Sequence, residues 1–176
     1  MKIFLWGMEH NINLHSVKAI ICVQTVLNLE IYGDGALKDE LMNLIEQRNL
    51  LNRVFIYPSN SNIFDIINNS SLFVLTSNYE GLPNVVMEAM ALGVPCVCTD
   101  CRPGGVRTLI EHGVNGMIVP RENVEKLAEV IRYMLENREY SEKIGIEAMK
   151  IRDNHSLECI FSKWRNYINL IVENKK

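Results

Sequence analysis

The chain has 176 residues, a length that fits one domain. Apolar residues make up 48% and charged residues 22% of it, which is the balance of a globular protein with a sizeable core and excludes a disordered or fibrous chain. The formal net charge is −3 and no block of Lys or Arg alternates with aromatic residues, so nucleic acid is not expected as a partner.

Short apolar runs alternate with longer segments of helical period, which is typical of βα units around a parallel sheet. The predicted strands are, in chain order, residues 2–6, 29–32, 54–57, 72–76, 95–98 and 117–119. The predicted helices between them, with apolar residues three or four positions apart, are residues 14–27, 37–48, 63–68, 85–92, 106–111 and 124–135. The sequence therefore predicts a doubly wound, Rossmann-like parallel α/β sheet.

The chain after residue 138 is predicted to be entirely helical, with helices over residues 140–152 and 157–172. Trp164, Tyr167 and Ile168 form one apolar stripe on the second of these helices, a pattern that usually packs into a core. No Gly/Ser-rich linker, low-complexity tract or internal repeat interrupts the chain. We therefore expect residues 1–176 to form a single domain whose helical tail covers about residues 140–176.

Five cysteines, Cys22, Cys96, Cys98, Cys101 and Cys159, occur in a chain without a recognisable secretory signal, so reduced thiols are expected. Three of them are close in sequence, but residues two apart on the predicted strand share a face and no fourth ligand stands at a zinc-like spacing. We therefore expect small buried hydrophobic side chains and no metal site.

No apolar run reaches the roughly 18 residues that a membrane span requires. The apolar start of the chain ends by Gly7 and no small-residue cleavage site follows it, so a signal peptide is not expected. We expect a cytoplasmic protein, for which a peripheral contact with the inner face of the membrane stays open.

The loop after the fourth predicted strand, residues 77–84, holds the polar residues of greatest interest, because ligands bind beyond the carboxyl ends of open parallel sheets. Asn84 is predicted to be the N-cap of the next helix, whose free N–H groups and dipole favour a phosphate. Gly81 lets a ligand approach the backbone. Glu88, one turn into the helix, can reach a ribose, while Glu80 faces what lies beyond the diphosphate. On spacing alone, a solvated helix start with two surface glutamates is the alternative.

The run Asn-Tyr-Glu-Gly-Leu-Pro-Asn at residues 78–84, continued to Pro95, resembles the signature of the retaining GT-B glycosyltransferases, the glycosyl transferases group 1 of bacterial polysaccharide synthesis. Its glutamates, Glu80 and Glu88, are separated by seven residues. Further matches follow in the family's order at residues 31–35, 99–105 and 115–120, and the resemblance covers about residues 29–135.

The resemblance implies the C-terminal, nucleotide-sugar-binding half of a GT-B fold, with the N-terminal acceptor domain absent from this chain. It implies that Glu80 is the catalytic residue that faces the donor sugar and that Glu88 holds the ribose. The other donor-binding residues that it implies are Gly81, Leu82, Pro83 and Asn84 through their backbone, and Tyr57, whose loop flanks the base. Gly33, in a turn after the second strand, either contacts the donor or only connects strand and helix.

The implied reaction is the transfer of a hexose, with retention, from a nucleoside-diphosphate sugar to a glycan or lipid-linked acceptor. We favour a UDP-sugar as donor, with no cofactor and no metal. The acceptor would be held by a missing or separate N-terminal domain.

One departure from the family concerns the loop at residues 7–13, which contains no Lys or Arg although such cations usually neutralise the departing diphosphate there. Arg102 is a candidate substitute, but a surface arginine is the interpretation we favour.

Two other functions stay open. One is a catalytically silent module that binds a nucleotide sugar or docks onto a partner transferase, and the other is half of a sugar-nucleotide epimerase. A dinucleotide-dependent dehydrogenase is disfavoured, because the loop after the first strand has only Gly7 and no glycine-rich phosphate motif.

Overall fold

The computed structural model describes residues 2–6, 28–33, 36–58 and 62–173. The predicted helix at residues 14–27, with Cys22, and the loop at residues 7–13 lie outside the described residues.

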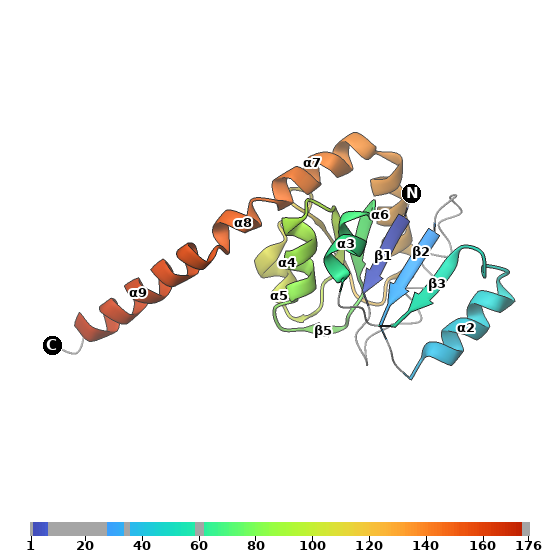
Figure 1. Cartoon of the computed structure of the whole chain (residues 1–176), viewed down its shortest axis with the longest axis horizontal. Coiled ribbons are helices and arrows are strands. Elements are labelled where there is room, and N and C mark those ends of the chain that lie inside the picture. Colours follow the sequence, from blue (N-terminus) through green and yellow to red (C-terminus); the bar gives the residue numbers. More distant parts are fainter. Residues whose placement is uncertain (1, 7–27, 34–35, 59–61, 174–176) are drawn as a thin grey trace.

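A six-stranded parallel sheet forms the centre of the domain (Figure 1). Its strands are β1 (Lys2–Trp6), β2 (Asn28–Tyr32), β3 (Val54–Tyr57), β4 (Leu72–Leu75), β6 (Cys96–Thr99) and β8 (Met117–Val119). They lie in the order β3-β2-β1-β4-β6-β8, and every pair is parallel. All residues of β4 and β6 are buried, as expected for inner strands that are covered on both faces.

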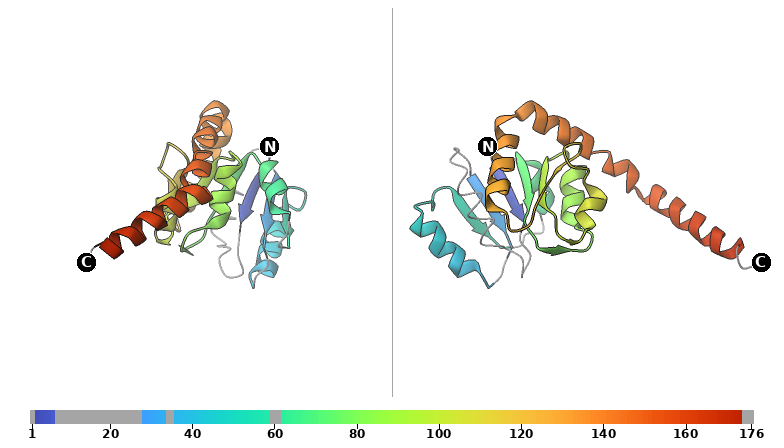
Figure 2. Two further views of the ribbon diagram at one scale, coloured as in Figure 1. Left: turned by 60° about the vertical axis from the view of Figure 1, so that its left-hand side comes forward. Right: turned by 180° about the vertical axis from the view of Figure 1, so that it is seen from behind.

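Helices cover both faces of this sheet, which confirms the predicted doubly wound fold. On one face, α2 (Lys38–Gln47) and α6 (Val124–Glu136) contribute Leu41, Ile45 and Ile131 to a core with Ile3 and Val74. On the other face lie α3 (Ile63–Asn68), α4 (Asn84–Ala91) and α5 (Gly105–Leu109) (Figure 2). Their buried side chains form a second core with Phe4 and Phe73.

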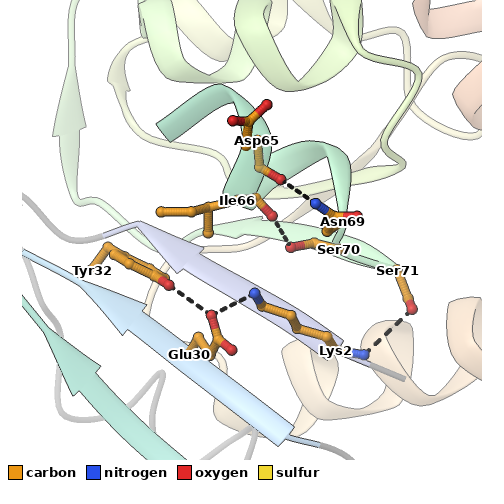
Figure 3. Close-up of polar contacts among 8 residues, drawn as sticks. All are labelled: Lys2, Glu30, Tyr32, Asp65, Ile66, Asn69, Ser70 and Ser71. Atoms are coloured by element: carbon orange, nitrogen blue, oxygen red, sulfur yellow. Dashed lines mark hydrogen bonds and ion pairs between the residues drawn. The ribbon is translucent and has the colours of Figure 1, made fainter. Parts of the chain in front are cut away.

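Four aromatic rings from neighbouring strands stack across the face that α3 and α4 cover. Phe4 stacks on Phe73 with ring centroids 5.5 Å apart and on Tyr32 at 5.0 Å, and Tyr32 stacks on Tyr57 at 5.0 Å. The Tyr32 hydroxyl donates to Glu30 Oε2 at 2.7 Å, and burial together with this carboxylate raises the pKa of Tyr32 (Figure 3). The stack ties the edge strand β3 to the centre of the sheet.

The helical tail is confirmed, but it differs from the prediction in two ways. The predicted helix over residues 140–152 is divided into α7 (Arg138–Ala148) and α8 (Ile151–Asn154), whose Ala148 and Ile151 pack into the core. The expected core packing of the last helix is wrong. None of the residues of α9 (Leu157–Glu173) is buried, because the helix extends away from the sheet (Figures 1 and 2). Its apolar stripe is therefore exposed, at 61% for Trp164, 57% for Tyr167 and 54% for Ile168.

None of the helices in the described parts of the chain combines the length and apolar character that a membrane crossing requires.

Candidate functional site

The strand order reverses between β1 and β4, since β2 and β3 follow on one side and β6 and β8 on the other. In open α/β sheets the ligand site lies at such a switch point, outside the carboxyl ends of the strands. The segment that follows β4, residues 76–83, lies at this point and carries Glu80, Gly81, Leu82 and Pro83.

Glu80 lies in a short strand that sequence reasoning missed. β5 (Tyr79–Glu80) pairs in parallel with β7 (Arg102–Pro103), so that Tyr79 lies beside Arg102 and Glu80 beside Pro103. The Arg102 N–H also donates to the Asn78 carbonyl at 3.2 Å. Two strands of two residues leave no periodic pattern in a sequence, which is why only the structure reveals this link between the loops after β4 and β6.

The carboxylate of Glu80 is half-buried and held by a hydrogen bond. Ser77 Oγ donates to Glu80 Oε1 at 2.8 Å, and Thr99 Oγ1 donates to the Ser77 carbonyl at 2.6 Å.

Two other polar groups lie around this loop. Burial raises the pKa of the Cys101 thiol, and the charge of Glu80 raises it further. Asn78 Oδ1, in the same loop, is buried and has no hydrogen-bond partner among the described residues.

Two glycines fix the contact between the two loops. A Cβ added to Gly105 would lie 1.3 Å from the carbonyl oxygen of Gly81, so only glycine fits there. A Cβ added to Gly81 would meet no described atom within 4 Å. Gly81 therefore presents an open side.

The helix after this loop begins one residue earlier than predicted. Pro83, with ψ of 100°, is the N-cap of α4, and Asn84 is already the first helical residue. Asn84 is thus not the N-cap that we expected, because the Pro83 carbonyl accepts the first helical hydrogen bonds, from Val86 and Met87. No side chain caps the helix, so its first N–H groups stay available at the loop.

Glu88 lies one turn after Asn84 on the same face of α4, and both line a cavity of about 480 Å³. The cavity is also lined by Phe64 of α3, by Ile151 of α8 and by His155, which follows α8. The Glu88 side chain is half-buried. Sequence reasoning missed the contribution of α8, because nothing local relates it to α4.

Tyr57 and Gly33 lie at the carboxyl ends of β3 and β2. The Gly33 N–H donates to the Tyr57 carbonyl at 3.0 Å, and Gly33 has a φ of 144°, a conformation that favours glycine. Tyr57 is exposed on the edge strand β3, where its ring stacks on both Tyr32 and Phe55. These residues lie on the same edge of the sheet as Glu80, with β1 between β2 and β4.

Two arginines follow β6, and they differ in their partners. Arg107 donates from Nε and Nη2 to the two carboxylate oxygens of Asp100, both at 2.6 Å, and this pairing lowers the pKa of Asp100. Arg102 is exposed on β7 and makes no ion pair within the described ranges.

Cys96, Cys98 and Cys101 are buried in the apolar core below this site, as the sequence predicted for small hydrophobic residues. In the part of the chain that the structure describes, no group of three or more His, Cys, Asp or Glu side chains is placed to hold a metal ion.

This fold, with the Glu80 loop at the switch point and Glu88 one turn into α4, defines the C-terminal domain of a GT-B glycosyltransferase. The chain belongs to the family glycosyl transferases group 1, whose model matches residues 13–151. The resemblance found in the sequence is thereby confirmed.

Three proteins illustrate the relationship. An uncharacterized glycosyltransferase of Haemophilus influenzae is 30% identical over 141 residues, which cover 80% of this chain and 40% of that protein. TarM of Staphylococcus aureus, solved with UDP and alpha-GlcNAc-glycerol, is 26% identical with a TM-score of 0.79, over 93% of this chain and 34% of that one. HepE of Anabaena, solved with UDP, shares the fold at 22% identity with a TM-score of 0.86, and the match covers 96% of this chain and 48% of HepE.

The chain thus spans less than half the length of these three proteins.

Proposed function

We propose that this domain binds a UDP-sugar and supports the transfer of its hexose, with retention, to a glycan or lipid-linked acceptor. The acceptor would be held by a second domain, because the chain spans only 40% of its Haemophilus relative. TarM was solved with UDP, and this supports the choice of a uridine donor.

The observation that carries the proposal is the arrangement of two glutamates around one helix start. Glu80 precedes α4 at the sheet edge, and Glu88, one turn into α4, lines the cavity that runs along this helix. A diphosphate at the uncapped N–H groups of α4 would be favoured by the helix dipole. Its ribose would then lie toward Glu88 and its sugar toward Glu80.

The remaining assignments follow from this placement. Gly81, Leu82, Pro83 and Asn84 would contact the diphosphate and sugar through their backbone. Tyr57 would flank the base, and Gly33 would allow the chain to turn beside it. We propose that binding needs no metal, since the helix start itself compensates the phosphate charge.

The test is calorimetric titration of the chain with UDP, GDP and their common sugar conjugates, without divalent metal. Glu88→Ala removes a carboxylate that accepts ribose hydroxyls, so we expect UDP affinity to fall by about 10- to 100-fold, the equivalent of about 1.5–3 kcal/mol. Glu136→Ala, an exposed glutamate at the end of α6 on the other face of the sheet, is the control. Unchanged affinity in Glu88→Ala would contradict the assignment.

A catalytically silent donor-binding module is the second candidate, because residues 7–13 contain no Lys or Arg. It predicts binding of UDP-sugars without transfer, even when an acceptor-binding domain is supplied. Formation of a new glycosidic product by this chain would eliminate it.

A further inference from the structure

Ser77 is a buried hydroxyl residue just after β4, in the loop that the sequence analysis singled out, but no role of its own was predicted for it. We propose that Ser77 is a positioning residue that sets the orientation of the Glu80 carboxylate toward the donor sugar. This inference rests on the proposed function and adds to it a residue that acts through Glu80.

The contact itself is specific. Ser77 is 1% exposed, and its Oγ lies 2.8 Å from Glu80 Oε1. A serine hydroxyl has a single proton to donate, whereas an ionised carboxylate only accepts. Ser77 therefore occupies one oxygen of Glu80 and leaves Oε2 available for a hydroxyl of a sugar. Without this bond the half-buried carboxylate would be free to rotate about its last side-chain torsion.

Ser77 is in turn fixed by the neighbouring strand. Thr99, 4% exposed at the end of β6, donates from Oγ1 to the Ser77 carbonyl at 2.6 Å. The Thr99 carbonyl accepts from the Cys101 N–H at 2.8 Å. One hydrogen bond thus holds the Ser77 backbone to the end of β6, and a second joins the Ser77 side chain to Glu80. A fixed orientation matters for a carboxylate next to a reacting carbon, because a small error in its placement strongly lowers its contribution to catalysis.

The pairing of β5 with β7 holds the backbone of Glu80 independently of Ser77. Loss of the Ser77 hydroxyl is therefore expected to change the direction of the carboxylate and not the course of the loop. A positioning role of Ser77 thus predicts changed contacts of the Glu80 carboxylate in a loop that keeps its course, whereas a merely structural role predicts a changed loop.

The first arm of the test measures binding. Calorimetry of the chain with UDP and with UDP-glucose gives the ratio of the two affinities, which reports the contacts of the sugar alone. We expect Ser77→Ala to leave UDP affinity within about twofold and to change the ratio at least fivefold in the direction that Glu80→Ala changes it. Ser77→Thr, which keeps the hydroxyl, is expected to restore the ratio. The double variant Ser77→Ala with Glu80→Ala should add nothing to Glu80→Ala alone, because both act on one interaction.

Ser70→Ala is the matched control, since Ser70 Oγ donates to the Ile66 carbonyl on α3 and not to Glu80 (Figure 3). Thermal unfolding of each variant identifies any that fail to fold. A ratio unchanged in a folded Ser77→Ala, or additive effects in the double variant, would overturn the proposal.

The second arm needs no ligand. The ¹³C carboxyl resonance of Glu80, identified by its loss in Glu80→Gln, is expected to move in Ser77→Ala and to stay near its original position in Ser77→Thr. A resonance that does not move in Ser77→Ala would overturn the contact itself. This resonance could move although the unaltered chain binds neither UDP nor UDP-glucose. That result would overturn the proposed function and the role of Ser77 toward a donor, but it would leave the contact between Ser77 and Glu80 in place.

Discussion

At the scale of single residues, Gly105 and Gly81 form a pair whose substitutions are expected to act in opposite ways. An alanine Cβ at Gly105 would overlap the Gly81 carbonyl, whereas one at Gly81 would meet no described atom. We expect Gly105→Ala to lower the free energy of unfolding by at least about 2 kcal/mol, because backbone has to move.

Gly81→Ala serves as the control for this prediction. It should leave the free energy of unfolding within about 0.5 kcal/mol but weaken UDP binding, since its open side is the proposed approach of the donor. Chemical denaturation and calorimetry measure both quantities. Equal stability of the two variants would show that the loops do not touch as described.

Most of the residues of the proposed site come from the sequence, because they share one local motif. Glu80, Gly81 and Glu88 stand within nine consecutive residues, and their position after an apolar strand placed them at the carboxyl edge. The contact between Ser77 and Thr99 could not be predicted, since the two residues are 22 positions apart and their hydrogen bond depends on the order of β4 and β6 in the sheet.

At the scale of elements, the strands of the six-stranded sheet and most of the described helices were predicted within one or two residues. Their apolar runs alternate with segments of helical period, and both faces of the sheet are covered, which makes the pattern strong. The break between α7 and α8 was not predicted, because residues 140–152 keep their helical period across it. The position of α9 was not predicted either, because an amphipathic stripe predicts an apolar face but not the surface that covers it.

The last helix provides a prediction at this scale. Since α9 buries none of its residues, a chain that ends at Ser156 is expected to unfold within a few °C of the full chain. A chain that ends at Asn137 also loses the buried Ile144, Ala148 and Ile151, and should be severely destabilised. Thermal unfolding followed by circular dichroism distinguishes them. A large loss of stability in the first truncation would mean that α9 packs on the domain in solution.

At the scale of the whole molecule, a bound donor is expected to stabilise the domain by mass action. UDP at a hundred times its dissociation constant should raise the free energy of unfolding by about 2.7 kcal/mol. EDTA should not change this, because the proposed site holds the diphosphate by the N–H groups and dipole of α4. The measurement is the thermal midpoint with and without UDP, each with and without EDTA. Loss of the UDP effect in EDTA would point to a metal in the site.

The pairing of β5 with β7 also affects how the proposed donor site could be redesigned. The segments at residues 77–83 and 99–105 are held together by backbone hydrogen bonds, by Thr99 and by the tight approach of Gly105. A chimera that takes only residues 77–83 from a relative would place them beside residues 99–105 of this chain, whose contacts they do not match. The two segments therefore form one exchangeable unit, and chimeras should carry both.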